Sequence, residues 1–103
     1  MEKKMLTKKF FKTKDDCEVT FVYDNESASE VALVGDFNGW EPVPMKKAKK
    51  AGSPYRVNAR MPKNGEYQFR YYVDGSYWAN DAEADAYWPN EFGDTNSVVN
   101  TYE

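Results

Sequence analysis

The sequence contains no histidine and a single cysteine, Cys17. One cysteine excludes an internal disulfide, which fits a reducing compartment, and we expect a cytoplasmic protein. A cysteine nucleophile is usually activated by a histidine, and this chain has none. Because Cys17 alternates with Val19 and Phe21, we expect a buried thiol on a strand.

Long apolar runs are also missing. No run approaches the ~20 residues of a membrane-spanning helix. No apolar segment follows the basic residues near Met1, so the sequence predicts no signal peptide. We therefore expect no membrane partner.

Cations are absent after Arg70. Lysines gather instead in residues 1–14 and 46–50, while the net charge is -3. An acidic chain with two short basic clusters is a poor nucleic-acid binder, so we expect no nucleic-acid partner. The 46–50 cluster is typical of a solvated loop.

Aromatic residues, by contrast, make up 17% of the 103 residues. This favours strands, and the length suits one domain over 1–103, with 1–14 as a basic arm or edge strand. Alternation and turn signals indicate strands near 6–12, 17–23, 30–34, 55–61, 66–73, 76–79 and 97–102. On the 66–73 strand, alternation divides the side chains between an apolar face, with Tyr67, Phe69, Tyr71 and Val73, and a polar face, with Gln68, Arg70, Tyr72 and Asp74. The predicted fold is an all-β, immunoglobulin-like antiparallel β-sandwich of about seven strands. Residues 81–96 are predicted to form a long loop, and Met45 to enter the core.

The segment from Gly35 to Trp40 is the most informative in the chain. It follows an apolar strand, and its Gly, Asp and Asn residues turn the backbone. An aromatic at the end of such a turn either plugs the core or offers a platform to a flat ligand. Spacing alone does not decide between these two roles for Trp40.

Three further residues suit a sugar site beside Trp40. Pyranose rings stack their C–H faces on aromatic rings, for which Trp78 is a second candidate. Their hydroxyls need donors and acceptors, which Arg70 and Asn96 supply. Each also has an ordinary explanation: strand packing for Trp78, a surface charge for Arg70 and a turn for Asn96. Trp88 is interpreted as a loop anchor.

Four ordered motifs resemble carbohydrate-binding modules of family 48, the isoamylase N-terminal-like (early set) domains. The glycogen-binding domain of the AMP-activated protein kinase beta subunit belongs to this group. The motifs lie at residues 34–40, at 65–75, at Trp78 with Asp81, and at 93–99. They span roughly residues 16–102, nearly the whole chain.

The resemblance implies site residues. Trp40 and Trp78 fall where family members stack glucose, Arg70 and Asn96 fall where they bond hydroxyls, and Phe92 falls where an apolar residue enters the curve of the glucan. Arg70 replaces the lysine of the kinase domain, and its planar fork makes different contacts. One extra residue precedes Trp78, which makes Tyr77 an alternative platform.

The leading hypothesis is therefore a non-catalytic module that binds α-1,4-glucan, with no cofactor and no metal. The alternative is a protein-interaction domain that accompanies a glycogen-metabolising enzyme and has lost sugar binding. A third hypothesis is a small glycosidase that uses two carboxylates from the 81–85 segment. It is disfavoured because nothing in the sequence predicts that one of these acids is buried, as a general acid requires.

Overall fold

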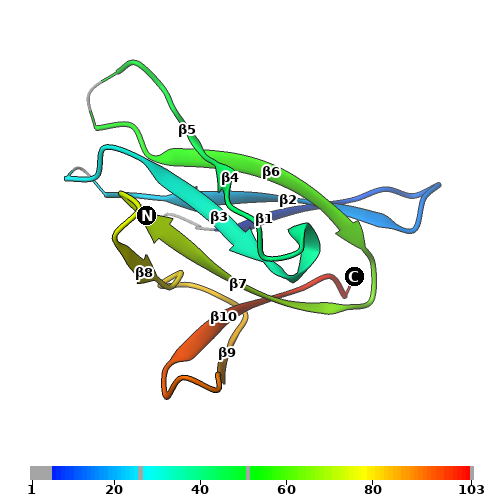
Figure 1. The fold of residues 1–103 in the computed structure, drawn as a ribbon. Helices are drawn as coiled ribbons and strands as arrows, with labels where there is room; N and C mark the ends of the chain where they lie inside the picture. The colour runs from blue at the N-terminus through cyan, green and yellow to red at the C-terminus, as the bar shows by residue number, and fades with distance from the viewer. Residues whose placement is uncertain (1–5, 26, 51, 103) are drawn as a thin grey trace.

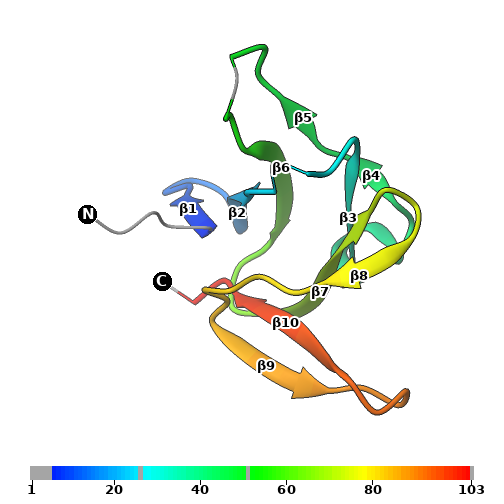
Figure 2. The same cartoon turned by 90° about the vertical axis from the view of Figure 1, so that its left-hand side faces the viewer.

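Two antiparallel sheets pack face to face in the computed structural model, which describes residues 6–25, 27–50 and 52–102 (Figures 1 and 2). The four-stranded sheet has the order β1-β2-β6-β5. The six-stranded sheet has the order β4-β3-β7-β10-β9, and β8 also pairs with β7. This is the predicted β-sandwich.

The elements have the following bounds: β1 Leu6–Phe10, β2 Asp16–Tyr23, β3 Val31–Gly35, the 3-10 helix η1 Asp36–Asn38, β4 Val43–Pro44, β5 Lys46–Lys47, β6 Tyr55–Pro62, β7 Glu66–Val73, β8 Tyr77–Ala79, β9 Ala86–Pro89 and β10 Thr95–Asn100. β1 is an edge strand of the four-stranded sheet, as predicted for part of the basic arm. Residues 1–5 of that arm lie outside the described residues.

The sequence alternation places alternate side chains on the two faces of each long strand. On β7, Phe69, Tyr71 and Val73 are buried, whereas Gln68 and Arg70 face outward into a surface groove. The predicted division of this strand is therefore confirmed. Because β7 pairs with β3, β8 and β10, its outward face lies at the centre of the six-stranded sheet.

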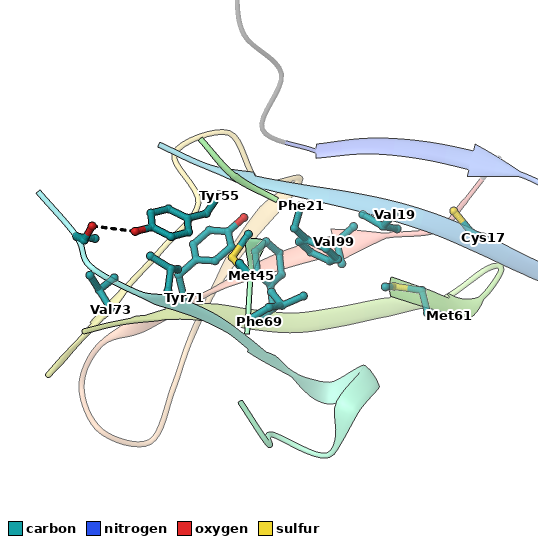
Figure 3. Packing of buried hydrophobic residues seen from close by; sticks show 13 residues of the cluster. Cys17, Val19, Phe21, Met45, Tyr55, Met61, Phe69, Tyr71, Val73 and Val99 are labelled. Carbon is teal, nitrogen blue, oxygen red and sulfur yellow. Dashed lines mark hydrogen bonds between the residues drawn. The ribbon is translucent and has the colours of Figure 1, made fainter. Parts of the chain in front are cut away.

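The core lies between the sheets (Figure 3). Phe69 packs edge-on against both Phe21 and Tyr71, with ring centroids 5.0 and 5.7 Å apart. Cys17 and Met45 are buried in the same cluster, as the sequence predicts. Aromatic pairs in this edge geometry add to the stabilisation from area burial.

The described residues form ten strands where about seven were predicted, because β4, β5 and β9 are too short to show a clear alternation in the sequence. The prediction of a loop over 81–96 was wrong for its second half. There β9 pairs with β10, so that Trp88 lies opposite Asn96. A four-residue edge strand that ends in proline has too little alternation to be seen in the sequence, and proline is tolerated at a sheet edge. None of the helices in the described ranges has the length and apolar character to cross a membrane.

Candidate functional site

A groove runs over the outward face of the six-stranded sheet. The turn after β3, strands β7, β8 and β10, and the β9–β10 turn contribute to it. Its lining consists of Asp36, Trp40, Gln68, Arg70, Ser76, Tyr77, Trp78, Pro89, Asn90, Glu91, Phe92, Asp94 and Asn96. The structure thus brings all six predicted site residues together, and their role in binding stays a prediction.

The turn after β3 places its two aromatic residues in different surroundings. Phe37 stacks on Phe21 of the core, with ring centroids 5.3 Å apart. Trp40 lies in the groove with 40% of its surface exposed. Gly35 allows the Phe37 ring to lie against the backbone, because a Cβ at this position would lie 2.8 Å from both the Phe37 ring and the Gln68 carbonyl oxygen. Phe37 is therefore the plug, and Trp40 is free to meet a ligand.

Trp40 is held in an unusual backbone conformation. Its φ is 61°, in the left-handed region that large side chains rarely adopt. Its N–H donates to the Gly35 carbonyl oxygen at 2.9 Å. Its indole Nε1–H donates to Asp36 Oδ1 at 2.8 Å, and Asp36 Oδ2 accepts the backbone N–H of Gln68, also at 2.8 Å. One carboxylate thus ties the indole to the central strand β7.

The second tryptophan is fixed by strand pairing. Trp78 lies opposite Tyr72, so both side chains share the outward face. Their rings are 4.5 Å apart, and the Arg70 guanidinium lies 5.7 Å from the Trp78 ring centroid. Tyr77 is opposite Val73, which belongs to the inward face, and its hydroxyl accepts a hydrogen bond from Asn25. The Trp78 indole therefore lies beside Arg70 despite the extra residue that precedes it.

Arg70 bridges the sheet and the β9–β10 turn. Its Nη2 lies 3.0 Å from Asp94 Oδ2. The backbone N–H of Thr95, and then Arg70, lower the pKa of Asp94, which keeps this carboxylate ionised. Arg70 Nε is buried and has no acceptor among the described residues. A buried donor of this kind is costly until an acceptor arrives.

A chain of amides forms the floor beside Arg70. Asn90 Nδ2 donates to Asn96 Oδ1 at 3.2 Å, and Asn96 Nδ2 donates to Gln68 Oε1 at 3.1 Å. The same Asn90 accepts the backbone N–H groups of Phe92 and Asp94 with its Oδ1. Asn90 therefore shapes the turn that presents Phe92, whose exposed fraction is 85%. The groove combines aromatic faces with donors and acceptors in fixed directions.

A family comparison agrees with this geometry. The model for the glycogen recognition site of AMP-activated protein kinase matches residues 17–103. The chain belongs to this family. As a member of the glycogen-recognition family, it is a carbohydrate-binding module of glucan-binding type, which confirms the resemblance seen in the sequence.

A protein that is not named as a kinase is also similar to this chain. The phosphoglucan phosphatase LSF1, chloroplastic, of Arabidopsis thaliana is 32% identical over 81 residues. The match covers 79% of this chain and 13% of the phosphatase, so the chain spans a small part of that relative. The similar region is thus a minor part of a longer enzyme.

Sequence reasoning missed four polar residues of this glycogen-recognition domain: Asp36, Gln68, Asn90 and Asp94. Asp36 was visible as an acid four residues before Trp40, but its second bond, to Gln68 on a distant strand, was not. Gln68 was assigned to the outward face without a role. Asn90 and Asp94 fell in the supposed loop, whose hairpin geometry the sequence did not predict.

The expectation that no acid of the 81–85 segment is buried was wrong for Asp81. Asp81 is 1% exposed, and its carboxylate accepts hydrogen bonds from the Tyr71 hydroxyl and the Glu83 N–H. Burial raises the pKa of Asp81, and these two hydrogen bonds offset part of the increase. Asp81 does not line the groove of this family member. Within the described ranges, no three His, Cys, Asp or Glu residues gather into a possible metal site.

Proposed function

We propose that this domain binds α-1,4-glucan, such as glycogen, starch or maltooligosaccharides, in the groove and without catalysing a reaction. The observation that carries the proposal is the meeting of two exposed indoles, Trp40 and Trp78, with Arg70 and Asn96 in one groove. Exposed tryptophans on one surface are typical of binding sites. Sugar rings stack on the indoles, and their hydroxyls bond the polar groups.

The contacts support separate roles for the groove residues. Trp40 and Trp78 stack on glucose units, and Phe92 enters the curve of the glucan helix. Trp78 is favoured over Tyr77 as the second platform because it shares a face with Arg70, while the Tyr77 hydroxyl is bonded to Asn25. Arg70 Nε, buried without an acceptor among the described residues, suits a sugar hydroxyl as its acceptor.

The carboxylates of the groove support binding without hydrolysis. A glycosidase needs a general acid with a raised pKa next to a second carboxylate. The pKa of Asp94 is lowered instead, both oxygens of Asp36 accept protein hydrogen bonds, and the third carboxylate, Glu91, is exposed to solvent rather than buried. Asp81 has a raised pKa, but it lies outside the groove lining.

Calorimetric titration of the protein with β-cyclodextrin tests the proposal. Trp40→Ala and Trp78→Ala should each weaken binding by about thirtyfold or more, the usual loss at a central aromatic contact. Tyr102→Ala is the matched control, because Tyr102 is exposed but lies outside the groove lining, and it should leave the affinity unchanged. Normal binding by both tryptophan variants would show that the site lies elsewhere.

We further propose that the chain works beside a glycogen-metabolising enzyme. The similar region occupies 13% of the phosphatase relative, which supports a targeting module next to a catalytic unit. The alternative, an interaction domain without sugar binding, predicts no calorimetric response to β-cyclodextrin. The single-domain boundaries, the likeness to isoamylase N-terminal domains and the cytoplasmic location stay predictions.

A further inference from the structure

The charges around the groove are unbalanced. Among the described lining residues, one cation, Arg70, stands against three carboxylates: Asp36, Glu91 and Asp94. The lining therefore carries a formal charge of −2. Arg70 is already paired with Asp94 at 3.0 Å, so the cation of the groove is neutralised before a ligand arrives.

The other described cations belong to the opposite sheet. They lie in β1, β5 and β6 or in the loops next to these strands: Lys8, Lys9, Lys12, Lys14, Lys46, Lys47, Lys49, Lys50, Arg56, Arg60 and Lys63. Figure 2 shows β1 and β5 apart from β8 and the β9–β10 hairpin. At physiological salt, exposed charges beyond about 8 Å are largely screened. The lysines therefore do little to offset the groove's negative charge.

From this arrangement we infer that the groove selects uncharged glucan and rejects glucan that carries a phosphate monoester. The inference rests on the proposed function and specifies its ligand class. A phosphate monoester brings a charge of about −1.5 to −2 at neutral pH. Against a groove of net negative charge, this repulsion weakens binding on the order of fivefold at low salt.

The structure offers no free cation that would reverse this preference within the described lining. A phosphate that contacts the unpartnered Nε of Arg70 meets a guanidinium that is already paired with Asp94, so two anions then share one cation. Glu91 is exposed next to Phe92, on the turn that meets the ligand. An anionic substituent near Phe92 therefore meets a carboxylate rather than a cation.

Calorimetry with two probes tests the inference: maltoheptaose, and maltoheptaose with one 6-phosphate. At 20 mM NaCl the neutral probe should bind about fivefold more tightly, and at 500 mM NaCl the two affinities should converge as screening increases. Glu91→Lys and Asp94→Asn should each reduce or reverse the ratio of affinities. Glu66→Gln is the matched control, because Glu66 is exposed at the start of β7 but does not line the groove, and its ratio should equal that of the wild type.

The outcomes separate the two proposals. Equal affinity for the two probes at low salt, tighter binding of the phosphorylated probe, or a ratio that ignores Glu91→Lys overturns the charge selectivity and leaves glucan binding intact. Failure of both probes to bind overturns the proposed function and the selectivity with it. For each variant, the affinity for the neutral probe is divided by the affinity for the phosphorylated probe. A substitution that weakens the binding of both probes equally therefore leaves this ratio unchanged.

Discussion

The two sheets of the sandwich are alike inside and different outside. Both bury apolar side chains, such as Phe21 on β2 and Phe69 on β7, in one core. Outside, the four-stranded sheet shows charged residues such as Arg56 and Arg60, whereas the six-stranded sheet gathers aromatics and amides around Arg70. The inward faces specify the fold, so the outward faces are where two domains of this fold differ in function.

The largest effect should come from the inward faces. Phe21→Ala removes a fully buried ring that contacts both Phe69 and Phe37. We expect the free energy of unfolding to fall by about 3–5 kcal/mol, measured by urea denaturation. Thr20→Ala, on the outward face of the same strand, should change it by less than about 1 kcal/mol. Similar losses for the two variants would contradict the division of the two faces.

Asp36→Asn should have the second largest effect, and it should weaken ligand binding rather than folding. The amide keeps one acceptor, so either the Trp40 indole or the Gln68 N–H loses its partner. A hydrogen bond to a charged group contributes about 1.5–3 kcal/mol, so we expect about tenfold weaker binding of β-cyclodextrin. The nuclear magnetic resonance signal of the Trp40 indole N–H should shift in the unliganded variant.

Asp74→Asn is the matched control for this experiment. Asp74 likewise accepts two hydrogen bonds, from the backbone N–H groups of Ser29 and Glu30 to its Oδ1, but at a hairpin outside the groove. It should leave both the affinity and the indole signal unchanged. If Asp74→Asn weakens binding as much as Asp36→Asn, the effect reflects loop stability and not the placement of Trp40.

A smaller effect should appear in the pH dependence of stability. Burial raises the pKa of Asp81 in the folded protein above its value in the unfolded chain. Between the two pKa values the folded state binds more protons, so the contribution of Asp81 to stability is largest at low pH and falls as pH rises through this window.

Asp81→Asn removes this titration. The free energy of unfolding of the wild type, minus that of the variant, should therefore decline as the pH rises from about 3.5 to 7. Urea denaturation at several pH values measures the difference. A constant difference would show that folding leaves the pKa of Asp81 unchanged, and a rising difference would show that the folded state favours the charged carboxylate.

The smallest effect should come from the outward lysines. Lys49→Gln and Lys50→Gln change exposed residues next to β5, in the loop that leads to β6. Since screening confines such charges to their surroundings, the affinity for maltoheptaose should change by less than about twofold in calorimetry. A larger change would extend the site onto the four-stranded sheet.

Residues close together in the sequence were the most predictable part of this molecule. Alternation gave the correct faces of β7, and it placed Arg70 outward and Phe69 inward. The burial of Asp81 was not predictable, because its N–H donates to the Ser97 hydroxyl on β10 and its carboxylate accepts a hydrogen bond from the Tyr71 hydroxyl on β7. Alternation along a strand indicates which face of the sheet a side chain lies on. Which residues cover that side chain depends on how the two sheets pack.

The position of Trp40 depends on both the local sequence of its turn and the packing of the two sheets. Its turn was evident from Gly35 to Gly39, but its exposure in the groove followed only from the fold, in which Phe37 and not Trp40 stacks on Phe21 of the core. The pairing of β9 with β10, which sets Trp88 opposite Asn96, was likewise not predictable, because a short edge strand shows too little alternation in its sequence.

The placement of the lysines has a practical consequence. Cations at β1 and β5 and carboxylates at the β9–β10 turn give the domain an electric dipole moment. A dipolar particle turns its positive end toward an anionic surface. We therefore expect adsorption to a cation-exchange resin at low salt despite the net charge of -3, with the groove directed into solution. Such a resin would serve as a glucan affinity matrix without chemical coupling.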